Sequence, residues 1–302
     1  MTRPETDVVI GAFSYTGRYI ARRLLATGKR VVTLTRHPQD DPEISAYPLN
    51  FNDPAKLVGH LAGVTTLYNT YWVRFAYGDV SFDRAVANSR VLVQAARDAG
   101  VRRIVHVSIA NASSASPLPY FRGKGLVEEA IQQSGLSYGI LRPTLVFGRE
   151  DVLVNNITWF LRRIPVFGVP GDGSYPVQPV YVDDLAGLAV GLGEDGRNMV
   201  IDAAGPETLS FEAMVRLLAR VIKARVKILH LSPDTMATAA SFASRFLHDV
   251  VLTRDEIDGL MAGLLISRDP PRGTTRFTEW IPEHAGLLGE DWRSELGRHY
   301  RL

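Results

Sequence analysis

The stretch from Val8 to Pro38 constrains the fold more than any other part of the sequence. An apolar run reaches Gly11, a second glycine follows at Gly17, an amphipathic pattern covers 17–27, and another apolar run comes after it. A strand, a turn bounded by glycines, a helix and a second strand form a βαβ unit. Such a unit makes its two strands parallel, and parallel sheets have helices on their faces.

Strand-like and helix-like segments continue to alternate along the chain. Strands are expected at 8–11, 30–35, 46–51, 65–70, 103–109 and 137–144. Helices are expected at 17–27, 54–61, 79–99 and 119–133. This order predicts an α/β fold: a Rossmann-type doubly wound parallel sheet with a smaller, mostly helical C-terminal lobe.

The pattern loosens after Pro143, where a short helix and a loop rich in proline and glycine lead to a strand expected at 177–182. Beyond this strand the apolar spacing becomes mainly helical. We therefore expect a dinucleotide-binding domain over 1–165, completed by a return of the chain at about 175–205. The remainder, 206–302, is expected to be a helical substrate lobe.

Composition narrows the class of protein. The 302 residues are 46% hydrophobic, with a formal net charge of +2 and no long run of like charges, which argues against a nucleic-acid partner. The absence of cysteine excludes disulfides, thiolate metal sites and cysteine nucleophiles. No metal motif, membrane-length apolar run or signal-peptide segment is visible. We expect a cytoplasmic monomer or homodimer with a small-molecule substrate, without bound metal.

The turn between the two glycines has the length and position of a dinucleotide-binding turn. It follows a strand and opens a helix, where the free N–H groups and positive end of the helix dipole favour a pyrophosphate. The middle position, which is usually a third glycine, is Ser14, whose hydroxyl could itself bond a phosphate oxygen. The alternative is a purely structural turn. The residues assigned here to the cofactor are Gly11, Phe13, Ser14, Tyr15, Thr16 and Gly17.

The end of the second strand favours NADP over NAD. Enzymes selective for NAD tend to place a carboxylate there, whereas this strand ends in Arg36, whose guanidinium suits a phosphate dianion. Arg36 could instead cap a solvated edge, so NAD stays open. Asn50 and Phe51 follow the third expected strand, where they could edge an adenine ring.

A second constellation surrounds Tyr120 and Lys124, which lie one helical turn apart and therefore share a helix face. An ammonium beside a phenol stabilises phenolate, so the phenol can exchange a proton with a carbonyl or an alcohol. Ser108 ends a strand and could hold the substrate oxygen. The alternative is that the tyrosine packs and the lysine only binds the cofactor ribose.

These motifs resemble the short-chain dehydrogenase/reductase superfamily, in its extended to atypical branch, and in particular bacterial relatives of the nucleotide-binding accessory subunit of respiratory complex I. The resemblance covers roughly Val8 to Val190 and includes "LRPTLVFGRED" and "PVYVDDLA". It implies a Rossmann fold, NAD(P), and Ser108, Tyr120 and Lys124 as catalytic residues, with Asn88 supporting the proton relay. Further cofactor contacts are placed at Asn69, Thr70, Tyr71, Lys124 and Pro143.

The expected function is that of an NADP-dependent reductase or dehydrogenase of a small to medium organic carbonyl or alcohol. Tyr71 and Trp72 stand where active members of the superfamily usually have small residues near the nicotinamide, and their bulk would narrow or close a site. The alternative is therefore a sensor or assembly protein that binds NADP(H) without turnover. A nucleotide-sugar epimerase or dehydratase is a third reading.

Four other polar residues have interpretations simpler than a catalytic or metal-binding role. His106 lies inside an expected strand and is interpreted as a core residue. Asp183 and Asp184 are adjacent at a strand-to-helix junction, so their side chains point apart, and an N-cap role is expected rather than a metal site. Asp151, next to Glu150, is also interpreted as a helix cap.

Overall fold

The structure, a computed structural model, describes residues 5–300 and divides the chain into two compact units. The first comprises the chain as far as Pro143 together with Val182–Ala203, and the second comprises Thr144–Tyr181 and the chain from Ala204 onward. Both units are therefore discontinuous in sequence.

The first unit is built on a seven-stranded sheet in the order β11-β6-β5-β4-β1-β2-β3, in which every neighbouring pair is parallel. The strands are β1 (Thr6–Ile10), β2 (Arg30–Thr35), β3 (Ile44–Pro48), β4 (Thr66–Asn69), β5 (Arg103–Val107), β6 (Ser137–Pro143) and β11 (Met199–Ala203). The strand order reverses between β1 and β4, which is the point where doubly wound folds bind ligands. The expected fold class is confirmed.

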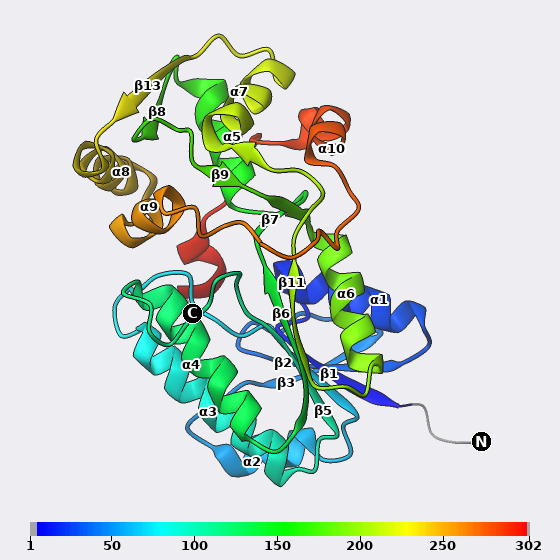
Figure 1. Cartoon of the computed structure of the whole chain (residues 1–302). Helices are drawn as coiled ribbons and strands as arrows, with labels where there is room; N and C mark the ends of the chain where they lie inside the picture. The colour runs from blue at the N-terminus through cyan, green and yellow to red at the C-terminus, as the bar shows by residue number, and fades with distance from the viewer. Residues whose placement is uncertain (1–4, 301–302) are drawn as a thin grey trace. The chain divides into compact units, whose positions relative to one another are not determined.

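Helices cover both faces of this sheet (Figure 1). Their bounds are α1 (Tyr15–Ala26), α2 (Pro54–Leu61), α3 (Phe82–Asp98), α4 (Pro119–Gln133) and α6 (Val182–Glu194). Helices α1 and α6 pack together on one face, and α2, α3 and α4 follow one another on the other. Because both faces are covered, the central strands are apolar without alternation: Val8, Val9 and Ile10 are all buried.

Asp183 lies inside the first turn of α6 rather than before it. Its carboxylate accepts two hydrogen bonds of 2.8 Å from Arg23 on α1, so it joins the two helices of one face. The N-cap interpretation was wrong for both Asp183 and Asp184 because the helix begins earlier, at Val182, directly after a strand.

The second unit has three two-stranded sheets and more residues in helices than in strands. Its elements are β7 (Leu145–Phe147), α5 (Leu153–Arg163), β8 (Val166–Pro170), β9 (Pro176–Val177), β10 (Pro179–Tyr181), β12 (Leu209–Ser210), α7 (Phe211–Val221), β13 (Lys227–Leu231), α8 (Pro233–Leu247), α9 (Arg254–Met261), α10 (Phe277–His284), the 3-10 turn η1 (Ala285–Leu287) and the π-helical turn η2 (Leu296–Tyr300). The pairs are β10–β7, β12–β9 and β13–β8. Phe147, Met214 and Phe277 are fully buried in its core.

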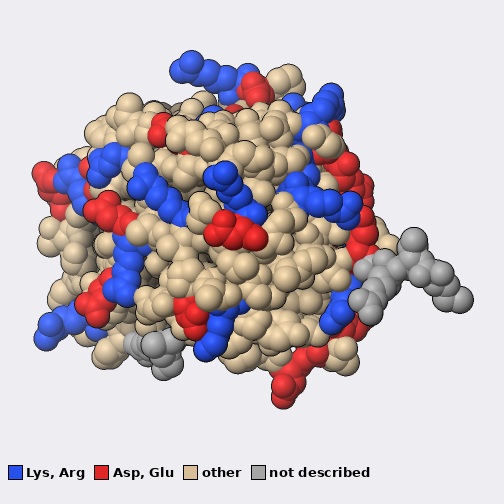
Figure 2. All heavy atoms as spheres, turned by 90° about the horizontal axis from the view of Figure 1, so that it is seen from below, with Lys and Arg blue, Asp and Glu red and all other residues tan. Residues whose placement is uncertain are grey.

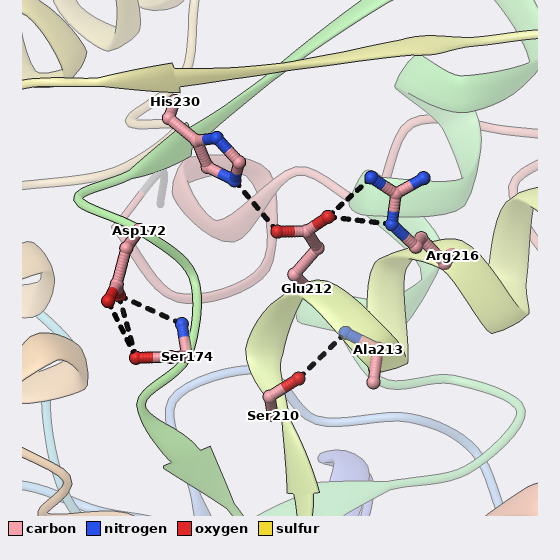
Figure 3. Close-up of polar contacts among 7 residues, drawn as sticks. All are labelled: Asp172, Ser174, Ser210, Glu212, Ala213, Arg216 and His230. Carbon is pink, nitrogen blue, oxygen red and sulfur yellow. Dashed lines mark hydrogen bonds and ion pairs between the residues drawn. The ribbon is translucent and has the colours of Figure 1, made fainter.

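A polar cluster at the start of α7 is shown in Figure 3. Glu212 accepts from Arg216 and, at 2.7 Å, pairs with His230 of β13. Its backbone N–H donates to the carbonyl of Gly173 at 3.0 Å. Ser210 caps the helix by accepting from the N–H of Ala213, so this end of α7 is held by both backbone and side-chain bonds.

The observed boundary differs from the expected one at residue 165. Residues 144–165 belong to the second unit because β7 pairs with β10 and α5 packs on α7, whereas the main sheet takes β11 as its last strand. Asp151 does cap α5, since its carboxylate accepts from the N–H of Val154 at 2.7 Å. The substrate role assigned to the C-terminal lobe stays a prediction.

Two surface properties bear on possible partners. Within residues 5–300, no helix combines the length and the apolar character that crossing a membrane requires. On the face drawn in Figure 2, lysine and arginine side chains are interspersed with aspartate and glutamate. On this face the two signs of charge are therefore mixed rather than gathered in separate patches.

Candidate functional site

The turn after β1 is closed so tightly that two of its positions require glycine. Gly11 has a φ of +66°, in the left-handed region that favours glycine. A Cβ on Gly17 would lie 2.2 Å from the carbonyl oxygen of Gly11, far inside any permitted contact. The N-terminus of α1 therefore lies directly against the end of β1, as a dinucleotide-binding turn requires.

Ser14 is part of the closure of this turn. Its hydroxyl donates to the carbonyl of Gly11 at 2.6 Å, and its backbone N–H donates to the same oxygen at 2.8 Å. It occupies the N-cap position of α1, but its side chain accepts no hydrogen bond from the helix. The hydroxyl proton is thus used inside the turn, and the phosphate contact assigned to Ser14 stays a prediction.

The geometry of this turn fits a bound pyrophosphate. The peptide groups of Tyr15, Thr16 and Gly17 form the first turn of α1, where N–H groups and the helix dipole attract an anion. No acidic side chain lies in that first turn, so nothing there repels a phosphate. Arg18 donates to the carbonyl of Phe13 at 3.1 Å and so is held beside the turn.

Tyr71 contacts both Phe51, which was assigned to the adenine, and Asn88, which was assigned to the proton relay. Its ring centroid lies 4.8 Å from that of Phe51, and its hydroxyl accepts from the amide of Asn88 at 2.9 Å. Burial raises the pKa of Tyr71, while this hydrogen bond and the positive charge of Arg36 act in the opposite direction. Arg36 itself is exposed and follows β2, where a ribose phosphate would be met.

The carboxyl end of β4 is fixed by hydrogen bonds from two neighbouring strands. The amide of Asn69 lies 3.1 Å from Nδ1 of His106, and its oxygen accepts from the N–H of Tyr71 at 3.0 Å. Thr70 donates to the carbonyl of Ile10 at 2.6 Å. These bonds hold the segment after β4 next to the end of β1, beside the turn.

His106 is confirmed as a core residue. It is 0% exposed, and burial together with the charge of Lys124 lowers its pKa well below the usual value. The imidazole is therefore neutral, and its bond to Asn69 is structural. Among the described residues, no cluster of three or more histidine, aspartate or glutamate side chains is arranged to hold a metal ion.

Lys124 is a buried amine in the first unit. Only 3% of the residue is exposed, and its Nζ donates to the carbonyl of Val107 at 2.8 Å, at the end of β5. Burial lowers its pKa to about 7, with the carboxylate of Glu128 acting in the opposite direction. A lysine of this kind exchanges protons near neutral pH, as acid–base chemistry requires.

Trp72 lies along the face of α4 that carries Tyr120 and Lys124. Its ring centroid is 4.8 Å from the Lys124 ammonium and 6.0 Å from the Tyr120 ring, which it meets nearly edge-on. A Cβ on Gly123 would come within 2.8 Å of Trp72, so this glycine makes room for the indole. Phe82 also meets Tyr120 edge-on, at 5.9 Å between ring centroids.

The two aromatic residues expected near the nicotinamide therefore diverge. Tyr71 packs on Phe51, in the group assigned to the adenosine half, whereas Trp72 packs on α4. Asn50 lies in an exposed loop, where its side chain accepts from the N–H of Asn52 at 3.0 Å. Pro143 ends β6, and its carbonyl accepts from the N–H of Ala110 at 2.7 Å.

Ser108 is held by a carboxylate that the sequence motifs did not single out. Its hydroxyl donates to Glu128, which also accepts from Nε of Arg142 at 3.0 and 3.2 Å. Ser108 and Glu128 are 2% and 3% exposed. Glu128 follows Lys124 by one helical turn, as Lys124 follows Tyr120. This continued spacing was the signal that could have found it.

Comparison with known proteins supports the interpretation of the turn after β1 as a dinucleotide-binding turn. Residues 11–151 match the family described as NAD(P)H-binding. Sterol demethylase protein B of Methylococcus capsulatus is 34% identical over 222 residues, 62% of this chain and 67% of that protein. The chain belongs to the NAD(P)H-binding family. The cofactor expectation is confirmed at the level of NAD(P)H, and the roles assigned to individual residues stay predictions.

The chain is also similar to proteins named as a mitochondrial subunit of NADH dehydrogenase. The subunit named NADH dehydrogenase [ubiquinone] 1 alpha subcomplex subunit 9 from Arabidopsis thaliana is 26% identical over 86% of this chain and 70% of its own length. Its mouse counterpart is 31% identical over 70% of this chain. The chain spans only 57% of that mouse protein.

Solved structures share the fold at low sequence identity. Triphenylmethane reductase of Citrobacter sp., crystallised with NADP(H), has a TM-score of 0.75 and 20% identity, covering 93% of this chain and 99% of that one. An NADPH-dependent quinone oxidoreductase of Escherichia coli has a TM-score of 0.72 and 22% identity, covering 93% and 98%. At this level of identity the likeness establishes the Rossmann-type fold.

Proposed function

We propose that this chain is an NADP(H)-dependent reductase or dehydrogenase of a small to medium organic carbonyl or alcohol. The observation that carries the proposal is the buried amine of Lys124, one helical turn from Tyr120 at the carboxyl end of the sheet. The dinucleotide turn opens at the same edge, because the carboxyl ends of parallel strands lie together. Arg36 supports NADP(H) over NAD(H).

NADP(H), when bound, supplies or accepts the hydride. Tyr120 is the proposed proton donor or acceptor for the substrate oxygen. The ammonium of Lys124 would stabilise the phenolate of Tyr120, and a pKa of about 7 lets the amine change its charge near neutral pH. Ser108 is fixed by Glu128, so its proposed part is to order this edge of the site rather than to donate its proton freely.

Names of structural neighbours support a reductase. The Citrobacter structure is described as a reductase complexed with NADP(H), and the Escherichia coli structure as an NADPH-dependent oxidoreductase complexed with NADPH. Both cover nearly all of this chain, including the second unit. Neither name identifies the substrate of this chain.

A second candidate is an NADP(H)-binding protein without turnover. The observation that favours it is the packing of Trp72 against Gly123, Lys124 and Tyr120, which leaves an aromatic wall where a substrate carbonyl would meet the phenol. The complex I relatives carry a subunit name rather than the name of a separate enzyme, which agrees with this candidate.

One experiment separates these candidates. The protein is purified without added nucleotide, the bound dinucleotide is identified by mass spectrometry, and NADPH oxidation is followed with a panel of ketones, aldehydes and quinones. The reductase proposal expects copurified or added NADP(H) to bind and at least one acceptor to be reduced. Binding of NADP(H) without reduction of any acceptor would favour the second candidate. If neither NADP(H) nor NAD(H) binds, both candidates are contradicted.

A further inference from the structure

Glu128 contacts two other groups of the proposed site and lies one helical turn from a third. Its carboxylate accepts from Ser108 after β5 and from Arg142 on β6, and it lies one helical turn beyond Lys124 on α4. The Glu128 side chain is 4% exposed and that of Arg142 is 29% exposed. Removing such groups from water costs about as much free energy as the pairing returns. Fold stability alone therefore gives no reason for this pair.

Charge balance suggests what the carboxylate does. Lys124 and Arg142 bring two positive charges to this part of the first unit, and Glu128 brings the negative charge that faces both of them. The other titratable groups nearby are Tyr120, on the same helix, His106 on β5, which is neutral, and Asp202 on β11, whose negative charge acts on Arg142. Glu128 is thus the carboxylate that acts on Lys124.

We propose that Glu128 is a positioning residue of the hydride-transfer site, which stabilises the ammonium of Lys124 and fixes the hydroxyl of Ser108. The inference rests on the proposed function for its meaning, but the contacts that carry it do not depend on a substrate. Arg142 holds the carboxylate in place by donating from both Nε and Nη2, and Ser108 donates to it as well. Tyr120 would then meet a lysine whose charge Glu128 controls.

The titration of Lys124 tests this directly. The chain has five lysines, so ¹⁵N-lysine labelling gives a simple NMR spectrum in which the Lys124 signal is identified by its loss in Lys124→Met. The wild type should titrate at a pH of about 7. Glu128→Gln should lower that midpoint by about one to three pH units, the range for removal of an adjacent opposite charge. In the reductase assay, the pH profile of kcat should move in the same direction.

Glu129→Gln is the matched control. Glu129 is the next residue of α4, is exposed and accepts from the hydroxyl of Ser114, so its loss should leave the Lys124 midpoint unchanged. Equal midpoints for Glu128→Gln and Glu129→Gln, with both proteins folded, would overturn the proposal.

A second pair of variants covers the case in which Glu128→Gln does not fold because Arg142 is left unpaired. The double variant Glu128→Gln/Arg142→Gln is compared with Arg142→Gln alone, which isolates the carboxylate from the guanidinium. The double variant should have the lower Lys124 midpoint, and equal values would again overturn the proposal. The NADPH affinity of the wild type is measured separately, because its absence would contradict the proposed function without affecting this titration.

Discussion

The ammonium of Lys124 lies 4.8 Å from the centre of the Trp72 ring while it donates to the carbonyl of Val107. The aromatic ring and the carbonyl replace part of the water that the amine loses on burial. The same contact places an indole beside Tyr120, on the face of α4 that the proposed chemistry uses. In the proposed function, Trp72 would therefore affect both the charge of Lys124 and the space beside Tyr120.

Trp72→Ala should show whether Trp72 lines the acceptor site or blocks it. In a working reductase, Trp72 forms one side of the acceptor site, so its removal should raise the KM for the acceptor by about tenfold, the loss of roughly 1.4 kcal/mol of aromatic contact. NADPH affinity should change much less. Trp159→Ala, which removes an indole from α5 in the second unit, is the control. If the wild type does not oxidise NADPH and the Trp72→Ala variant does, the indole closes the site.

Gly17→Ala should abolish dinucleotide binding. The new Cβ would lie 2.2 Å from the carbonyl oxygen of Gly11, and because this atom is backbone, the turn itself must move. We expect NADPH affinity to fall by about 100-fold or more, the loss of at least two charge-assisted hydrogen bonds. Isothermal calorimetry measures it. In the control, Gly59→Ala adds a Cβ with nothing within 4 Å on α2 and should bind normally.

Arg36→Ala should remove the preference for NADPH. Arg36 is exposed after β2, so its contribution is to the ligand rather than to packing. Its loss should weaken NADPH by about 1 to 3 kcal/mol, or roughly 5- to 150-fold, and leave NADH nearly unchanged. Calorimetry with both dinucleotides measures the difference. Equal affinities in the wild type would end the assignment of Arg36 to the ribose phosphate.

Lys124→Met should change how stability depends on pH. The folded protein lowers the pKa of Lys124 from 10.5 to about 7, so between these values the unfolded chain binds more protons than the folded one. The Lys124 contribution to stability is therefore complete above the unfolded pKa and is lost as pH falls through the folded pKa. From pH 7 to pH 9 the wild type should gain about 2 kcal/mol relative to Lys124→Met in urea unfolding. A constant difference would mean that Lys124 titrates normally.

The fold of the first unit could be predicted from the sequence because the patterns that indicate it are local. The glycine turn, the spacing of Tyr120 and Lys124, and the apolar runs of the strands each report on nearby backbone. What the motifs did not reveal are contacts between distant segments. Glu128 looks like one of many helix carboxylates, and its bonds to Ser108 and Arg142 arise only when α4 lies over β5 and β6.

Two further features needed the tertiary structure. Gly123 and Gly125 weaken the interior of a helix by about 1 kcal/mol each, which signals close approach, but only the structure shows Trp72 against the first and the 113–114 backbone against the second. The unit boundary was misplaced because "LVF" at 145–147 continues an apolar strand in sequence. In the structure it pairs instead with β10, which lies more than thirty residues later.

Tyr120→Phe gives the most direct test of the reductase proposal. The substitution removes one hydroxyl and keeps the ring contacts with Trp72 and Phe82, so fold and NADPH affinity should be preserved. If Tyr120 transfers the proton, kcat on any acceptor that the wild type reduces should fall by about 100-fold or more. An unchanged kcat in Tyr120→Phe, with NADPH bound as tightly as in the wild type, would contradict the proposed role of Tyr120.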